Sequence, residues 1–106
     1  MNITIIAVGK LKEKYFVSGI AEYLKRLQAY AKVEVIEVKE ESFTEPLSER
    51  QIESIKGKEA ERIIANIPER YYTIVLDRLG KQYSSEEFSR ILEEQAIYQQ
   101  GNVALV

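Results

Sequence analysis

Short pairs of glycine, lysine and glutamate are the features of this chain that could do chemistry. Gly9-Lys10 and Gly80-Lys81 each place a lysine directly after a glycine, and Glu86-Glu87 and Glu93-Glu94 each place two carboxylates side by side. A cation behind a glycine turn can face an anionic ligand at a strand end, and neighbouring carboxylates could exchange protons in acid–base catalysis.

Each pair also has a structural explanation, which we favour on pattern alone. Adjacent residues on a helix point about 100° apart, and a helix dipole stabilises Glu86 and Glu87 in a first turn. Gly80-Lys81 is equally typical of a strand-to-helix turn with a solvated lysine. Gly9-Lys10 is not a P-loop, because the required preceding glycine and following Ser or Thr are missing, and the Rossmann G-x-G-x-x-G fingerprint is absent.

Composition narrows the class of protein further. The chain has 106 residues, 45% of them hydrophobic and 30% charged, which predicts one globular domain. It has no cysteine and no histidine, so we expect no metal site, no disulfide and no Ser-His or Cys-His hydrolase chemistry. No apolar run approaches the ~20 residues of a membrane span, so we expect a cytoplasmic protein without a membrane partner.

Charge is unevenly distributed along the chain. The net charge is −2, but residues 1–32 hold six Lys or Arg against two Glu, which leaves the remainder strongly acidic. This asymmetry permits a basic face, although a solvated helix surface is the simpler interpretation because the whole chain is not basic.

The elements that would position these residues alternate between strand and helix. Continuous apolar runs predict strands over 3–8, 33–38, 71–76 and 103–106, and spacings of three and four predict helices over 14–30, 48–67 and 84–98. Ser48 with Gln51, and Ser84 with Glu87, form capping boxes at two helix starts. Most of the seven tyrosines fall on the apolar helix stripes, so we expect them in the core.

This alternation predicts a three-layer α/β/α fold on an open parallel sheet. Glu34 and Glu37 interrupt only the second strand, which therefore belongs at an edge, and the expected order is 2-1-4-3. The continuity of 71–76 predicts burial on both faces, and in a longer chain a fifth strand would cover that strand's open side. Ligands bind at the carboxyl ends of such strands, which directs attention to Gly9-Lys10, to Asp77 through Lys81, and to whatever follows Val106.

Three segments carry a resemblance to a known family. NITIIAVGKLKEKYFVSGIAEYLKRLQAYAKVEVIEVKE (2–40), KEAERIIANIP (58–68) and LDRLGKQYSSEEF (76–88) resemble, in this order, the corresponding motifs of the RlmH family of large-subunit ribosomal RNA methyltransferases. Ala60 stands where the family usually has glycine. The resemblance implies the knotted SPOUT (α/β-knot) fold, S-adenosylmethionine as cofactor, and N3-methylation of a pseudouridine of 23S ribosomal RNA in the assembled ribosome.

The resemblance also implies a homodimer and one cofactor contact, Leu76, and it gives no catalytic residue within this chain. A strand that ends on four apolar residues predicts that the natural chain continues past Val106. We therefore expect residues 1–106 to be a single SPOUT-like domain, incomplete at its C-terminal end, that binds S-adenosylmethionine weakly or not at all and is inactive alone. The alternative is a shortened or engineered non-enzymatic α/β relative that acts only through self-association.

Overall fold

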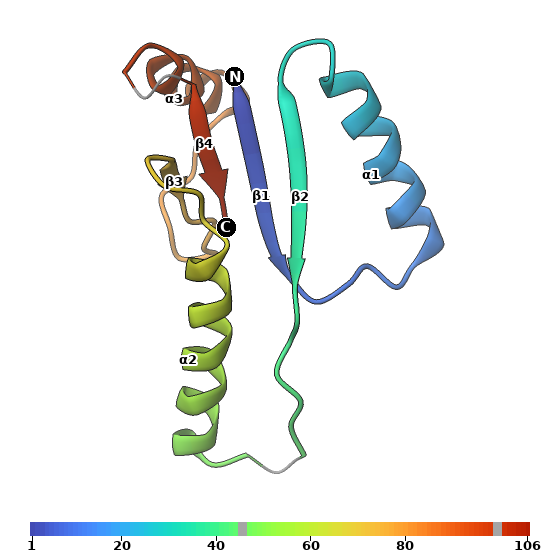
Figure 1. Ribbon diagram of the computed structural model, residues 1–106, viewed down its shortest axis with the longest axis vertical. Helices are drawn as coiled ribbons and strands as arrows, with labels where there is room; N and C mark the ends of the chain where they lie inside the picture. Colours follow the sequence, from blue (N-terminus) through green and yellow to red (C-terminus); the bar gives the residue numbers. More distant parts are fainter. Residues whose placement is uncertain (45–46, 99–100) are drawn as a thin grey trace.

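Strands and helices alternate along the chain in the computed structural model, which describes residues 1–44, 47–98 and 101–106 (Figure 1). The strands are β1 (Asn2–Val8), β2 (Lys32–Val38), β3 (Tyr72–Ile74) and β4 (Asn102–Leu105), and the helices are α1 (Lys14–Leu27), α2 (Glu49–Ala65) and α3 (Ser85–Tyr98). The predicted order of elements is confirmed, with α1 and α2 ending a few residues earlier than the apolar spacing indicated.

The four strands form one parallel sheet in the order β2-β1-β4-β3, as predicted. β1 pairs with β2 along its whole length and with β4 from Asn2 to Ile5. The core lies on these inner strands, where the side chains of Thr4, Ile6, Val103 and Ala104 are buried. β2 lies at an edge because its two glutamates require solvent, and both of them are exposed.

The expectation that residues 71–76 form a strand buried on both faces is wrong. β3 is regular only over Tyr72–Ile74 and lies at the open edge of the sheet, paired with β4 alone. The side chain of Val75 is 67% exposed for this reason. Backbone pairing nevertheless continues past the strand, because Val106 N donates to Ile74 O at 2.9 Å and Leu76 N donates to Val106 O at 2.8 Å.

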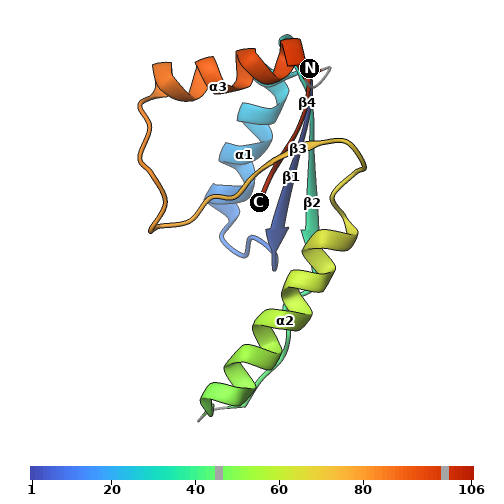
Figure 2. The same cartoon turned by 90° about the vertical axis from the view of Figure 1, so that its left-hand side faces the viewer.

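The helices cover both faces of the sheet and give the predicted three layers. Figure 2 shows α1 and α3 on one side and α2 on the other, running beyond the lower end of the sheet. This arrangement follows from right-handed crossovers, because the β2-to-β3 connection runs across the sheet in the opposite direction to the other two. No helix in the described part of the chain is long and apolar enough to cross a membrane.

Both predicted capping boxes are present and fix where α2 and α3 begin. The Ser48 hydroxyl accepts from Gln51 N at 3.2 Å, and the Gln51 side chain accepts from Ser48 N at 2.8 Å. Ser84 and Glu87 make the same reciprocal pair at 3.1 and 3.2 Å. Each box pairs backbone N–H groups that a helix start otherwise leaves without partners.

The expectation that most tyrosines are buried is also wrong. Tyr15, Tyr23, Tyr30 and Tyr98 are exposed, and Tyr30 lies beyond the end of α1 at 83% exposure. The physical reason is that each helix contacts only a small part of the sheet, which leaves many of its side chains exposed. α1 contacts the sheet mainly through β2, and none of its side chains is fully buried.

Candidate functional site

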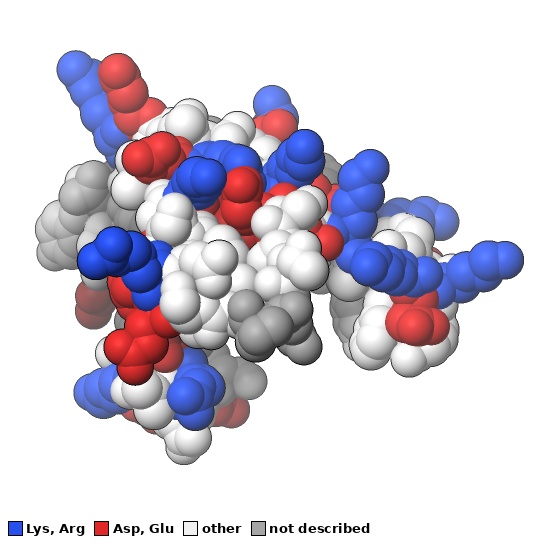
Figure 3. Space-filling view, turned by 90° about the horizontal axis from the view of Figure 1, so that it is seen from below, with Lys and Arg blue, Asp and Glu red and all other residues white. Residues whose placement is uncertain are grey.

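The carboxyl ends of all four parallel strands meet at one edge of the sheet, which Figure 3 views directly. A cavity of about 550 Å³ opens there at the end of β3. Its lining includes Leu76, Asp77, Gly80, Lys81, Tyr83 and Phe88. The structure thus brings together the residues that the strand-end rule selected after residues 71–76, and Leu76 is among them.

Leu76 combines a fixed backbone with a free side chain. Its N–H is held by the Val106 carbonyl at 2.8 Å, whereas its side chain is 65% exposed and lines the cavity. The backbone bond fixes the position from which the side chain projects, while the side chain itself would lose rotamer freedom when a ligand covers it. Leu76 is therefore well placed to offer an apolar surface to a ligand.

The loop that follows Leu76 is shaped by Asp77. One Asp77 carboxylate oxygen accepts from Leu79 N at 2.9 Å, and the Asp77 carbonyl accepts from Gly80 N at 2.9 Å. A Cβ at position 80 would lie 3.1 Å from that carbonyl oxygen, so the turn closes tightly only around glycine. The wall of the cavity is a hydrogen-bonded turn of defined shape.

Lys81 and Tyr83 form the outer part of the same wall. The Lys81 ammonium lies 5.1 Å from the centroid of the Tyr83 ring, within range of a cation–π contact. The lysine is exposed, as the structural interpretation of Gly80-Lys81 predicted, but it also lines the cavity. The structural interpretation of this pair is confirmed, and the functional one stays a prediction.

The sequence did not single out three side chains that complete the cavity. Tyr83 precedes α3, and Phe88 and Ile91 present one half-buried face of that helix to the end of β3. The available signal was the spacing of three between Phe88 and Ile91, which marks an apolar helix stripe. That stripe predicts the helix over 84–98, and the spacing alone does not tell whether it faces a core or a cavity.

The paired glutamates do not form a site. Glu86 and Glu87 occupy the first turn of α3, and Glu87 is engaged in the capping box with Ser84. Glu93 and Glu94 are exposed on the body of the same helix. Within residues 1–44, 47–98 and 101–106, no group of three or more His, Cys, Asp or Glu could hold a metal ion.

A second polar cluster ties α2 to the segment after β2. Arg62 donates to the Glu41 carboxylate and, through its other terminal nitrogen, to the Lys39 carbonyl at 2.9 Å. Lys58 lies 3.5 Å from the other Glu41 oxygen. The hydrogen bond from Arg62 lowers the pKa of Glu41, and Lys58 adds to this effect. The chain direction after β2 is fixed by these contacts.

Gly9-Lys10 lies apart from the Leu76 cavity. It borders a separate cavity at the carboxyl ends of β1 and β2, together with Lys12 and Lys39. The sheet edge therefore carries two hollows, an apolar one at β3 and a lysine-rich one at β1 and β2.

An open parallel sheet with helices on both faces defines an α/β protein of the doubly wound kind, and its carboxyl edge carries a cavity of the size of small-molecule sites. A sequence model of the family described as "Predicted SPOUT methyltransferase" matches residues 1–106. The chain belongs to this SPOUT methyltransferase family.

Relatives with curated names agree with this family. The chain is 53% identical to "Ribosomal RNA large subunit methyltransferase H" of Listeria monocytogenes serovar 1/2a, 54% to that of an Exiguobacterium species and 47% to that of Limosilactobacillus fermentum. Each match covers the whole of this chain and 67% of the relative.

Proposed function

We propose that this chain is the cofactor-binding part of a ribosomal RNA methyltransferase. In this proposal the Leu76 cavity holds S-adenosylmethionine, and the methyl group goes to N3 of a pseudouridine of 23S ribosomal RNA in the assembled ribosome. The observation that carries it is an open, ligand-sized cavity around Leu76 in a chain of the SPOUT methyltransferase family. The names of the relatives support ribosomal RNA as the substrate.

The residues present fit such a cofactor. The cavity volume of about 550 Å³ lies within the range of small-molecule sites, and its lining joins apolar side chains to a few polar groups. Leu76 and Phe88 offer apolar contact of the kind that a purine ring requires. The peptide groups after β3 and the Lys81 ammonium supply polar contacts nearby.

The chemistry requires orientation more than proton transfer by a side chain. S-adenosylmethionine, if bound, would supply an activated methyl group for transfer to N3 of the base, with S-adenosylhomocysteine and the N3 proton as the other products. The contribution of this chain is to hold one side of the reacting pair in place. Asp77 contributes indirectly. It accepts hydrogen bonds from Leu79 N and Gly80 N, and these bonds fix the shape of the turn that follows Leu76 at the cavity.

Residues 1–106 should bind the cofactor weakly, because the cavity is open to solvent and Leu76 remains 65% exposed. We also propose that the functional form is a homodimer in the cytoplasm, where the ribosome substrate lies.

Titration of ¹⁵N-labelled chain with S-adenosylmethionine, followed by NMR, tests the proposal at the level of single residues. We expect saturable shifts centred on Leu76, Gly80 and Phe88, and the same shifts with S-adenosylhomocysteine. Shifts centred elsewhere, or none at millimolar ligand, would contradict the assigned site. Self-association without cofactor binding would instead favour the non-enzymatic alternative.

A further inference from the structure

The lysine-rich cavity at the other half of the same sheet edge has no role in cofactor binding as proposed above. Its volume is about 550 Å³, and its lining includes Gly9, Lys10, Lys12, Glu37, Lys39 and Glu40. Lys10 and Lys12 come from the loop after β1, and Lys39 directly follows β2. Three cations from two separate loops thus border one hollow.

Backbone contacts hold the two loops together. Gly9 N donates to Val38 O at 2.9 Å, and Gly9 adopts a φ of 86°, which turns the chain away from β1 immediately before Lys10. The carbonyl of Lys39 accepts from Arg62 at 2.9 Å, which fixes the start of the other loop. Lys10 and Lys39 therefore adjoin fixed backbone, and Lys12 lies two residues further along the first loop.

These lysines are available to an external anion. Within the described residues, the salt bridges engage Arg26, Lys58 and Arg62, and none engages Lys10, Lys12 or Lys39. Glu37 and Glu40 offset part of the local charge.

The separation of the two cavities suits a nucleic acid strand. Neighbouring strands lie about 4.8 Å apart, so the ends of β1 and β2 lie roughly 10–15 Å from the end of β3 along the edge. A stacked strand advances about 3.4 Å per nucleotide, so this distance corresponds to about three or four nucleotides. A target base beside the cofactor at the Leu76 cavity would thus place the phosphates three or four nucleotides along the strand over the lysines.

We infer that Lys10, Lys12 and Lys39 bind backbone phosphates of the RNA whose target base lies next to the cofactor held at the Leu76 cavity. This inference rests on the proposed function. Lysines act as flexible point charges toward phosphate and position the strand without reading its sequence. The acidic remainder of the chain restricts such binding to this part of the surface, because the net charge is −2.

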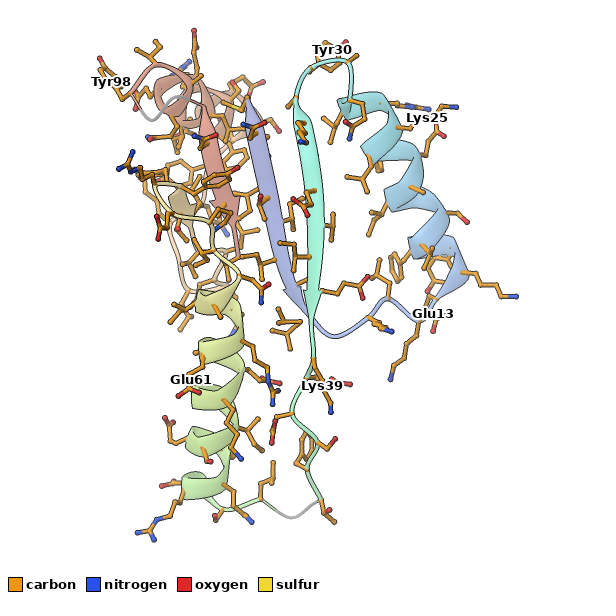
Figure 4. The ribbon with its side chains drawn as sticks, in the orientation of Figure 1. Glu13, Lys25, Tyr30, Lys39, Glu61 and Tyr98 are labelled. Carbon is orange, nitrogen blue, oxygen red and sulfur yellow. The ribbon has the colours of Figure 1, made fainter. Side chains whose placement is uncertain are left out.

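The test compares the triple variant Lys10→Gln, Lys12→Gln, Lys39→Gln with a control at the opposite edge. The control carries Lys25→Gln and Lys32→Gln. Figure 4 shows Lys25 beside the upper part of α1 and Lys39 just below the carboxyl ends of β1 and β2, and Lys32 begins β2 at the amino edge. Affinity for a fluorescein-labelled oligouridylate is measured by anisotropy over a range of salt concentrations. Circular dichroism checks folding, and the single variant Lys12→Gln replaces the triple variant if that does not fold.

Each phosphate contact to a single strand contributes about 0.7 to the slope of log affinity against log salt. Loss of three contacts should therefore lower the slope by about 2 and weaken binding roughly a hundredfold at ~0.1 M salt. The single variant should lower the slope by about 0.7, and the control should match the unmodified chain.

Three results would overturn the inference: equal losses in the test and control variants, no oligouridylate binding by the unmodified chain, or equally strong binding of polyglutamate, which would indicate an acidic protein partner. S-adenosylmethionine titrations of the same variants separate this inference from the proposed function. If the RNA result fails while cofactor binding stays, only the lysine assignment is wrong. If cofactor binding at Leu76 is absent as well, the proposed function is wrong.

Discussion

Truncation of Leu76 to alanine gives the sharpest test of the cofactor site. Full burial of a leucine side chain is worth about 1.5–3 kcal/mol. Leu76 is 65% exposed, so a ligand can bury about two thirds of it, which corresponds to roughly 1–2 kcal/mol of binding free energy. The Leu76→Ala variant should therefore bind S-adenosylmethionine about 5- to 30-fold more weakly.

The fold should survive this substitution, because the Leu76 contact with the sheet is made by its backbone. The Leu76 N–H bond to the Val106 carbonyl does not depend on the side chain. Exposed substitutions away from special features usually change stability by about 0.5 kcal/mol or less, so thermal unfolding should be close to that of the unmodified chain. A loss of binding could then be assigned to the site.

The same loop provides the matched control. Leu79 is 81% exposed, more than Leu76, and it does not line the cavity. Equilibrium dialysis with radiolabelled S-adenosylmethionine measures weak binding directly in both variants. Unchanged binding in Leu76→Ala, or an equal loss in Leu79→Ala, would refute the placement of the cofactor at the end of β3.

Three further outcomes are expected. Ser84→Ala should destabilise the chain by about 1 kcal/mol in urea unfolding, because it removes the cap of α3, and Ser89→Ala on the same helix should cost less. The pKa of Glu41 is lowered mainly by Arg62. The stabilising effect of Glu41 is therefore present above the ordinary glutamate pKa and is lost as pH falls through the lowered value. Arg62→Met should flatten this acid-side decline in the free energy of unfolding, measured in urea titrations, and an unchanged slope would contradict the assignment. Light scattering should show concentration-dependent self-association through the open edge of β3, and a monomer at every concentration would count against it.

The sheet could be predicted because its order depends on local sequence. Two glutamates in residues 33–38 mark an edge strand, and the continuous apolar runs of β1 and β4 mark inner ones. The starts of α2 and α3 were equally predictable, since a capping box is a contact between residues only three apart. Burial was predicted less well, because it depends on which elements lie opposite. The pattern of residues 71–76 is that of an inner strand, yet β3 pairs with β4 on one side only and its other side is exposed to solvent.

The candidate site, like the fold, could be predicted from the sequence only in part. Its location at the strand ends follows from the parallel topology, and Leu76 was selected by that rule together with the family resemblance. Phe88 and Ile91 could not be assigned to it, because an apolar stripe has the same spacing whether it faces a core or a cavity. The hydrogen bond that Leu79 N donates to Asp77 shapes one wall of the cavity, and the sequence could not predict this because the position of the turn beside β3 was unknown.

The two cavities at the carboxyl edge of the sheet are linked by its most deeply buried strand. The Leu76 cavity lies at the end of β3 and the lysine-rich cavity at the ends of β1 and β2, with β4 between them. Val103 and Ala104 of β4 are 0% exposed and pair with strands on both sides, so the distance between the cavities cannot change without breaking the core. Under the proposed function, a fixed distance of this kind would hold the cofactor in place relative to the contacts on the RNA strand, which is what methyl transfer by orientation requires.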